Sequence, residues 1–364
     1  ATLEFVGTVR CHNCPLNYLP HRDGKKTPAM IPRLDSPGHI PAWQTALARG
    51  FSSVEALLGH LGIASAPPLP AAAAEFPLRV PLSFVERMEP GNIDDPLLRQ
   101  VLPVAEENTD HPEYSRDPLE ESHVMPVPGL LHKYHGRALL TLTGACAVHC
   151  RYCFRRHFPY SESNPLGTGR EMTIGYLVKH PEIGELILSG GDPLSVPDER
   201  LSALAKQLSG IGHLHTLRIH TRLPVVLPER VDQRLLDWLS DLPQRVVMVV
   251  HCNHPNELDA TVETAMRPLQ QAGVVLLNQS VLLRGINDNA DTLARLSEKL
   301  LACGILPYYL HQLDRVQGAA HFAVGDSSAR ALMDTIHRRL PGYLVPRLVR
   351  ELPDCPGKSP LWPG

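Results

Sequence analysis

Short apolar segments alternate with amphipathic ones through the second half of the chain. Runs rich in Val, Ile and Leu predict strands at 138–143, 185–189, 216–220, 245–251, 273–281 and 304–310. Helical patterns lie between these runs, for instance at 198–208 and 290–302. Strands that are apolar on both faces predict a parallel sheet covered by helices, and right-handed βα crossovers favour closure toward a partial barrel.

The first 130 residues follow a different pattern. Apolar residues recur at near-helical spacing over 41–62, whereas 64–74 read as a Pro/Ala linker and 76–128 are acidic and punctuated by proline. Met30 is the first methionine, which leaves open whether the irregular segment 1–29 belongs to the natural protein. We therefore divide the chain into that segment, a helical Pro-rich region (30–130), the barrel (131–340) and a C-terminal segment (341–364).

Composition narrows the class of protein. Of the 364 residues 43% are hydrophobic, enough for a large core, and the net charge of −3 gives no reason to expect nucleic-acid binding. No apolar run approaches the roughly 20 residues of a membrane helix, and the polar start of the chain lacks a secretory signal. We expect a soluble cytoplasmic protein.

Polar residues cluster where the predicted strands end. The carboxyl ends of parallel barrel strands carry the active site in such folds. In strand order these residues are Cys146–Cys153, Ser189–Asp192, His220–Arg222, His251, Asn278–Gln279 and Asp314. This coincidence predicts one functional site at that edge.

Three cysteines after the first strand carry the chemistry. Cys146, Cys150 and Cys153 have the spacing C-x3-C-x2-C, and three thiolates on one loop can hold three irons of a 4Fe–4S cluster while the fourth iron stays open. The alternative is a zinc site completed by His149 or His157. A separate Cys11/Cys14 pair could form a partial zinc knuckle, although a lone C-x2-C motif is a weak signal.

The cysteine spacing, with an aromatic residue before the last cysteine, resembles the radical S-adenosylmethionine (SAM) superfamily. The resemblance implies that the open iron binds SAM and that an electron cleaves it to a 5′-deoxyadenosyl radical. The segment Ser189-Gly190-Gly191-Asp192 looks like the family's Gly-rich SAM segment. The candidate SAM contacts are Tyr152, Ser189, Gly190, Gly191, Asp192, Arg222 and His251.

A closer resemblance covers residues 76–358. The segments PVPGLLHKYHGRALL, CRYCFRRHF, LSGGDPL, NQSVLLRGIND and PYYLHQLD are similar to lysine 2,3-aminomutases, and LRVPLSFVERMEPGNIDDPLLRQ looks closest to the short subtype. That subtype makes (R)-β-lysine for translation elongation factor P. The resemblance implies an α/β fold, a partial (βα)6 radical SAM barrel with a mostly helical N-terminal extension. The segment Asn287–Asn289 and the six residues after Lys358 lack the zinc-binding cysteines of the longer lysine-degrading enzymes.

The family also uses pyridoxal 5′-phosphate (PLP), held as an imine by a lysine in a Gly-Lys-Thr-Pro-like turn. Lys358, in Pro356-Gly357-Lys358-Ser359-Pro360, matches that lysine, although taken alone it would be read as an exposed tail residue. By the same resemblance, Lys133 and Tyr134 match an Arg-Tyr pair at the PLP phosphate, and Arg137 and Gln279 are further PLP contacts. Lysine in place of arginine loses bidentate binding of the phosphate.

Substrate contacts are also carried over by position. Arg155 matches the arginine that binds the substrate carboxylate, and Asp314 and Glu351 match two carboxylates that hold the ε-ammonium of lysine. A buried cationic side chain requires such paired carboxylates. The plainer alternatives are a salt bridge near the cysteine loop for Arg155, a loop residue for Asp314 and a charge at a strand end for Glu351.

These observations predict an isomerase that converts L-lysine to (R)-β-lysine with a 4Fe–4S cluster, SAM and PLP. We expect an electron donor of the flavodoxin or ferredoxin type, an elongation factor P and its lysyl ligase as functional partners, and an oligomer is compatible with the sequence. Alternatives are an aminomutase that releases free β-lysine, one acting on another amino acid such as glutamate, and a non-enzymatic cluster- or zinc-binding partner of translation factors.

Overall fold

The computed structural model describes residues 40–64, 72–160, 166–167, 169–353 and 355–361. From Ile40 onward the chain forms one compact unit. The segment 1–29 and the Cys11/Cys14 pair lie outside the described residues, so the predictions made for them stay predictions.

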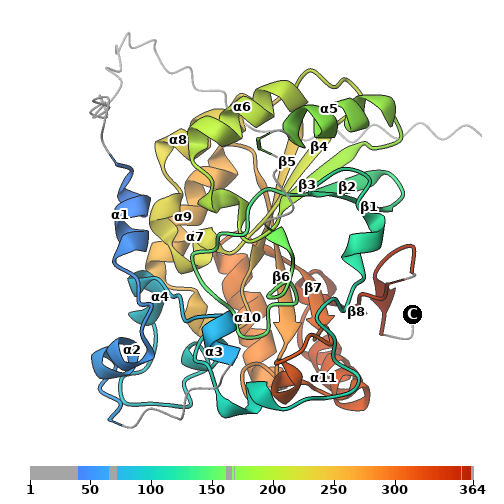
Figure 1. Ribbon diagram of the computed structural model, residues 1–364. Coiled ribbons are helices and arrows are strands. Elements are labelled where there is room, and N and C mark those ends of the chain that lie inside the picture. The colour runs from blue at the N-terminus through green and yellow to red at the C-terminus, as the bar shows by residue number, and fades with distance from the viewer. Residues whose placement is uncertain (1–39, 65–71, 161–165, 168, 354, 362–364) are drawn as a thin grey trace, which may run out of the picture. The chain divides into compact units, whose positions relative to one another are not determined.

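Nine strands form one sheet, in which each strand pairs with its neighbours in chain order (Figure 1). The strands are β1 (Leu130–Tyr134), β2 (Arg137–Thr141), β3 (Glu185–Ser189), β4 (Thr216–Thr221), β5 (Arg245–His251), β6 (Val275–Leu282), β7 (Leu306–Gln312), β8 (Arg347–Arg350) and β9 (Ser359–Pro360). Strands β2 to β8 run parallel, whereas β1 and β9 are antiparallel to β2 and β8 respectively. The sheet is the predicted partial barrel.

The six predicted strands are confirmed within a few residues as β2 to β7, but β8 adds a seventh parallel strand. β8 has four residues and β9 only two, and segments this short carry no period that a sequence reveals. The predicted parallel order requires buried strands, and Met248, Val249 and Val250 of β5 are indeed buried on both faces.

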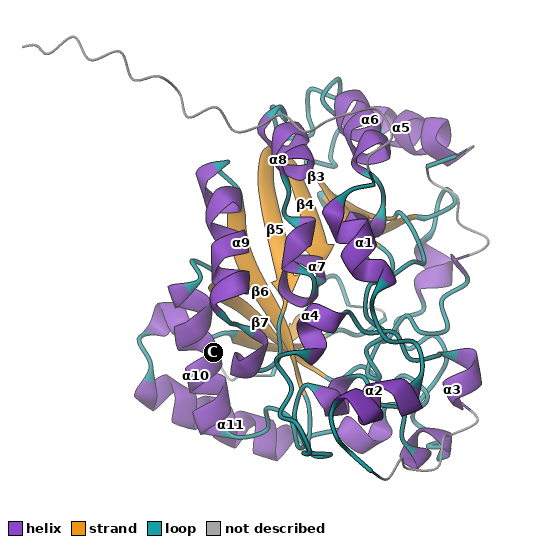
Figure 2. Cartoon of the chain, turned by 90° about the vertical axis from the view of Figure 1, so that its left-hand side faces the viewer, coloured by secondary structure: helices purple, strands orange, loops and turns teal. Residues whose placement is uncertain are grey.

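Helices cover the outer face of the sheet (Figure 2). Those that connect parallel strands are α5 (Gly169–Lys179), α6 (Asp198–Leu208), α7 (Leu223–Val226), α8 (Gln233–Ser240), α9 (Ala260–Gln271), α10 (Ala290–Ala302) and α11 (Asp326–Arg339). The helices α6 and α10 coincide with the ranges predicted from the sequence. None of the helices in the described part of the chain has the length and apolarity needed to span a bilayer.

The N-terminal region packs onto the barrel and shares its core. It contains α1 (Ala42–Ala48), α2 (Val54–His60), α3 (Ala72–Glu75) and α4 (Leu82–Val85), followed by short 3-10 turns. Trp43, Leu57 and Phe84 are buried in the same apolar cluster as the barrel residues. The region also contacts the cysteine loop, because the backbone N–H groups of His149 and Arg151 donate to the carbonyls of Arg79 and Gln100.

Side chains join the two edges of the open sheet. Tyr134 at the end of β1 donates its hydroxyl to Glu351, at 2.7 Å, and the Nζ of Lys133 donates to the carbonyl of Leu352, at 2.9 Å. Glu351 and Leu352 directly follow β8, so residues about 220 positions apart meet here. This junction lies beside the functional cavity described next.

Candidate functional site

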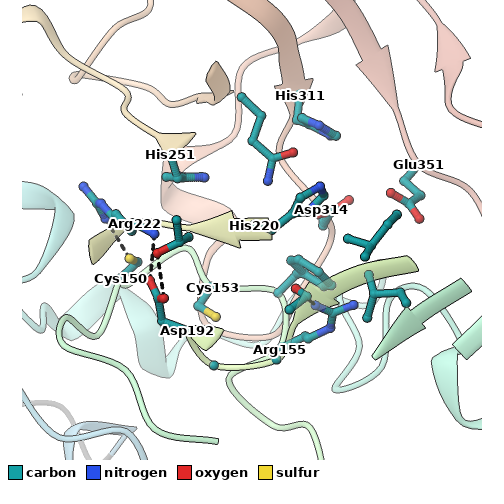
Figure 3. A pocket seen from close by; sticks show the side chains of 18 of the residues that line it. Cys150, Cys153, Arg155, Asp192, His220, Arg222, His251, His311, Asp314 and Glu351 are labelled. Carbon is teal, nitrogen blue, oxygen red and sulfur yellow. Dashed lines mark hydrogen bonds between the residues drawn. The ribbon is translucent and has the colours of Figure 1, made fainter. Parts of the chain in front are cut away.

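A cavity of about 360 Å³ opens at the carboxyl edge of the parallel strands. Every site residue predicted from the sequence lines it. These residues are Lys133, Tyr134, Arg137, Cys146, Cys150, Tyr152, Cys153, Arg155, Ser189, Gly190, Gly191, Asp192, Arg222, His251, Gln279, Asp314, Glu351 and Lys358. The structure thus places residues from β1 to β9 around one cavity (Figure 3).

The three cysteines lie on the loop that leaves β2. All three are half-buried and free, and the N–H of Cys153 donates to the carbonyl of Cys150, which closes a tight turn. Burial, together with the charge of Cys150, raises the pKa of the Cys153 thiol to about 11. Between the last two cysteines, the fully buried Arg151 bonds both oxygens of Glu107 and anchors the loop to the N-terminal region.

The Gly-rich loop after β3 needs its two glycines because it runs against the start of the cysteine loop. Gly190 has a φ of 122°, and a Cβ there would lie 2.6 Å from the carbonyl oxygen of Thr143. A Cβ on Gly191 would lie even closer to the carbonyl of Ala145. The N–H groups of Gly191 and Asp192 donate to those same two carbonyls, so backbone hydrogen bonds join the two loops.

Asp192 fastens this loop to the end of β4. Its carboxylate accepts hydrogen bonds from the Thr221 hydroxyl and from the backbone N–H groups of Leu194, Arg222 and Leu223. Burial outweighs these bonds and raises its pKa to about 6. The contacts show a positioning role for Asp192, whereas its predicted contact with SAM stays a prediction.

Arg222 lies directly behind the cysteine loop. Its guanidinium donates to the sulfur of Cys150, at 2.7 Å, and to the hydroxyl of Tyr152, at 2.8 Å. That hydroxyl also lies 3.1 Å from the Nε2 of His251, whose pKa is lowered to about 3 by burial and by the charge of Arg222. Tyr152, Arg222 and His251 therefore form one buried polar group beside the cysteines, and their predicted SAM contacts stay predictions.

The opposite end of the cavity is built around Lys358. Its Nζ donates to Glu351 at 2.7 Å and lies 5.6 Å from the centre of the Tyr309 ring. Although burial opposes ionisation of Glu351, Lys358 and Tyr134 lower its pKa to about 2. Glu351, predicted to hold the substrate's ammonium, is thus the counter-ion of Lys358 in the ligand-free protein.

The predicted phosphate contacts lie next to Lys358. Arg137 stacks on the ring of Tyr134, with its Cζ 4.6 Å from the ring centre. Lys133 instead bonds the carbonyl of Leu352, and the sequence did not indicate this use of its ammonium. Gln279 lines the cavity from β6.

Asp314, just after β7, has no hydrogen-bond or salt-bridge partner for its carboxylate among the residues described. Enclosure in the cavity and the nearby charge of Glu351 raise its pKa to about 7. Asp314 and Glu351 both line the cavity, but of the two only Glu351 is bonded to a cation, Lys358. A half-buried carboxylate with no bonded cation can pair with a cation that a ligand brings.

Arg155 is held by an acid that the sequence analysis missed. Its Nε and one terminal nitrogen bond both oxygens of Glu121, at 2.7 and 2.5 Å, and the other terminal nitrogen bonds the hydroxyl of Ser189 at 3.1 Å. Glu121 outweighs burial and raises the pKa of Arg155, which keeps it charged. Nothing in the spacing of the acidic stretch around Glu121 links it to an arginine 34 residues later.

Two histidines to which the sequence analysis assigned no ligand line the same cavity: His220 was only grouped with the polar residues at the predicted strand ends, and His311 was not named as a candidate. His220 and His311 each have a buried Nε2 without a hydrogen-bond partner in the described part of the chain. Burial, followed by the charges of Arg218 for His220 and of Lys358 for His311, lowers both pKa values well below the ordinary range, so both rings are neutral. Unpaired buried nitrogens facing a cavity indicate a polar ligand.

These parts fit a 4Fe–4S cluster with SAM at one end and PLP at the other. Three free thiols on one loop suit the cluster, and the glycine loop packed against the start of that loop lines the same cavity. Lys358 offers an amine for PLP, Arg137 offers a cation for its phosphate, and the unpaired nitrogens of His220 and His311 offer polar contacts.

Comparisons with known proteins agree with this geometry. A family described as a 4Fe-4S single cluster domain matches residues 135–217. The L-lysine 2,3-aminomutase of Escherichia coli K12 is 51% identical over 88% of this chain and 94% of its own length. The enzymes of that name from Haemophilus influenzae and Clostridium subterminale are 46% and 34% identical, over 87% and 88% of this chain and 94% and 78% of their own lengths.

Among solved structures, the radical SAM methyltransferase TsrM of Kitasatospora setae matches weakly, with a TM-score of 0.38 and 10% identity over 51% of this chain and 38% of its own. So weak a match gives no information about the activity of this chain. The relatives, by contrast, span nearly the whole chain at high identity. Together with the cysteine loop and the cavity, they show that the chain belongs to the L-lysine 2,3-aminomutase family.

Proposed function

We propose that this protein is an isomerase that converts L-lysine to (R)-β-lysine. One observation carries the choice of substrate: the carboxylate of Asp314 faces the cavity with a pKa raised to about 7 and no cation of the described chain bonded to it. A substrate with a terminal ammonium supplies that cation.

The same cavity offers a contact for the other end of lysine. Arg155 is charged, buried and lines the cavity, and its terminal nitrogens carry hydrogens beyond those used by Glu121 and Ser189. A carboxylate bound there and an ammonium bound at Asp314 would fix both ends of the substrate. Glutamate would instead bring a second carboxylate toward Asp314 and Glu351, which like-charge repulsion disfavours.

The cofactors would supply the difficult chemistry: SAM at a reduced cluster would provide a radical that removes a hydrogen atom from Cβ and later returns it to Cα, and PLP would carry the amino group as it moves from Cα to Cβ. The chain's own residues hold and orient these groups. Cys146, Cys150 and Cys153 bind the cluster, and the loop at Gly190 and Gly191 provides backbone contacts beside it.

Glu351 holds the amine of Lys358 in place. Its two oxygens are bonded to Tyr134 and to Lys358, which fixes the Nζ of Lys358 in the cavity. Because the pKa of Glu351 is about 2, it remains a carboxylate and serves as a counter-ion, not as a proton acceptor. With Lys358 engaged by PLP, Glu351 would be available beside Asp314 to share a substrate ammonium.

An anaerobic assay tests the reaction. The protein is reconstituted with iron, sulfide and PLP, given SAM and a strong reductant, and offered equal amounts of L-lysine and L-glutamate. We expect β-lysine of R configuration, detected by chiral chromatography and mass spectrometry, and none from C150A. β-Glutamate as the main product, or SAM cleavage with both amino acids intact, would refute the choice of lysine.

We further propose that the β-lysine is destined for a lysine side chain of elongation factor P, attached by a separate ligase in the cytoplasm. The resemblance of residues 76–358 to the short subtype supports this destination. Electrons would come from a low-potential flavodoxin- or ferredoxin-type protein. Adding elongation factor P and its lysyl ligase to the assay should produce a β-lysylated factor. An unmodified factor alongside accumulated free β-lysine would contradict this destination and leave the isomerase reaction standing.

A further inference from the structure

The guanidinium of Arg222 donates a hydrogen bond to the sulfur of Cys150, one of the three loop cysteines. The donating terminal nitrogen of Arg222 and the Sγ of Cys150 are 2.7 Å apart, and Arg222 is 6% exposed. Figure 3 shows the Arg222 guanidinium beside Cys150, on the side away from Glu351. A cation and an N–H donor are therefore aimed at one of the proposed cluster ligands.

The second terminal nitrogen of the guanidinium is held by groups that are fully buried, whereas its Nε has no hydrogen-bond partner among the described residues. This terminal nitrogen donates to Gln100, at 2.7 Å, and to Glu257, at 3.0 Å, and both residues have 0% exposure. Glu257 is fixed in turn, since its other oxygen accepts from Gln100 and from the backbone N–H groups of Asn253 and His254. The guanidinium of Arg222 is therefore held in place, and Glu257 is its ion-pair partner.

Charge near a cluster sulfur affects how readily the cluster is reduced. One-electron reduction from the 2+ to the 1+ state, by a low-potential electron donor, adds one negative charge to the site. Hydrogen bonds to the sulfurs and nearby positive charge stabilise the reduced form and raise the reduction potential. A buried carboxylate close to the same cation opposes that effect.

We propose that Arg222 is a positioning residue that raises the reduction potential of the cluster through Cys150, and that Glu257 moderates this effect. The inference rests on the cluster of the proposed function but not on lysine as its substrate. It also gives Arg222 a role that differs from the predicted contact with SAM. With Arg222 in place, an electron donor of less negative reduction potential could reduce the cluster.

The test is a redox titration followed by electron paramagnetic resonance of the reduced cluster, on reconstituted protein without SAM or amino acid. Arg222→Met removes both charge and donor and should shift the midpoint potential to a more negative value. Arg222→Lys keeps the charge and should shift it less. Glu257→Gln removes the counter-charge and should shift the potential in the opposite direction, to a more positive value.

Arg230→Lys is the matched control for Arg222→Lys. Arg230 is also fully buried and pairs with an acid, Asp198, but it does not line the cavity. It should lower thermal stability and leave the potential unchanged. Opposite shifts for the Met and Gln variants, at wild-type iron content, would support the proposal, because a merely structural role predicts no such reversal.

An unchanged potential in Arg222→Met, or shifts of the same sign in Arg222→Met and Glu257→Gln, would overturn the proposal. If Arg222→Met does not hold a cluster, the Lys and Gln variants decide by the same criterion. Failure of the lysine assay with these shifts present would refute the substrate and leave this inference intact.

Discussion

The two ends of the cavity are built differently. At the cysteine end, polar groups are bonded to protein: Asp192 accepts four hydrogen bonds, and Arg222 donates to Cys150, Tyr152, Gln100 and Glu257. At the Lys358 end, Asp314 and the Nε2 atoms of His220 and His311 have no partner in the described structure. The Lys358 end also contains internal bonds, from Glu351 to Tyr134 and Lys358, but it leaves Asp314 and the two histidines open to a ligand.

The difference indicates separate tasks. A cluster site must hold its cysteines and neighbouring charges in place through electron transfer, and its bonded network does so. A substrate site must replace bonds to water by bonds to the ligand, so its groups remain open until the ligand arrives. Substitutions at the Lys358 end should therefore affect lysine conversion while the cluster remains.

Lys358→Ala should have the largest effect. Loss of the amine that anchors PLP should reduce β-lysine formation by at least about 10³-fold. Iron content and the reduced-cluster spectrum should remain as in wild type, because Lys358 bonds Glu351 and lies over Tyr309, and in the described part of the chain it makes no hydrogen bond to the cysteine loop. The assay is product mass spectrometry, with the exposed Lys179→Ala as control. Full activity in Lys358→Ala would refute the role of this residue.

Asp314→Asn tests the recognition of the ammonium. Leaving a buried cation without its carboxylate costs about 3–5 kcal/mol, so kcat/KM for lysine should fall roughly 10²- to 10⁴-fold. Asp314→Glu, which keeps the charge, should lose less. Steady-state kinetics at saturating cofactors measure both, and an unchanged KM in Asp314→Asn would place the ammonium elsewhere.

Glu121→Gln should loosen Arg155 and weaken binding of the substrate carboxylate. The change replaces a bidentate charge-assisted pair by a neutral contact, so KM for lysine should rise roughly tenfold or more while kcat changes little. Glu121→Asp, which retains the charge, should recover part of the affinity. A fall in kcat with KM unchanged would argue against this positioning role.

The pH dependence of lysine affinity follows from Asp314. Its pKa in the ligand-free protein is raised to about 7, so below that pH it is neutral and cannot pair with an ammonium. Affinity should therefore fall about tenfold for each pH unit below about 7 and level off above it. Isothermal titration across this range should show the dependence in wild type, and its persistence in Asp314→Asn would assign it to another group.

The smallest effect is expected at Glu120, which presents Glu121 to the cavity. Glu120 is the single non-glycine residue in the described chain with a positive φ, at 51°. Glycine there relieves the steric cost, and Glu120→Gly should stabilise folding by up to about 1 kcal/mol, seen as a higher Tm. Glu120→Ala retains a Cβ and should show no such gain. A lower Tm for the glycine variant would show that Glu120 makes stabilising contacts.

The sequence predicts the cysteine end better than the Lys358 end because the residues that define the cysteine end lie close together in the chain. The C-x3-C-x2-C loop and the Gly190–Gly191 turn each lie within a few residues, and the structure packs one against the other. The buried partners of Arg222, by contrast, come from segments 122 and 35 residues away. Such pairs have no spacing that a single sequence reveals.

The Lys358 end was predicted through family resemblance, and its physical details come only from the fold. Strands β8 and β9 are too short to recognise, yet they bring Glu351 and Lys358 together. The pairing of Glu121 with Arg155 and the unpaired nitrogens of His220 and His311 depend on burial, which follows from tertiary packing. The residues expected to contact cofactors and substrate were predicted and line the cavity, whereas their hydrogen-bond partners were not predicted.

The most direct test of the account follows a hydrogen atom through the reaction. L-Lysine deuterated at Cβ is converted by the anaerobically reconstituted protein, and the β-lysine is analysed by NMR and mass spectrometry. We predict deuterium at Cα, the carbon from which nitrogen departed, and no product from Cys150→Ala or Lys358→Ala. β-Lysine that carries only solvent hydrogen at that carbon, or no β-lysine while SAM is cleaved, would contradict it.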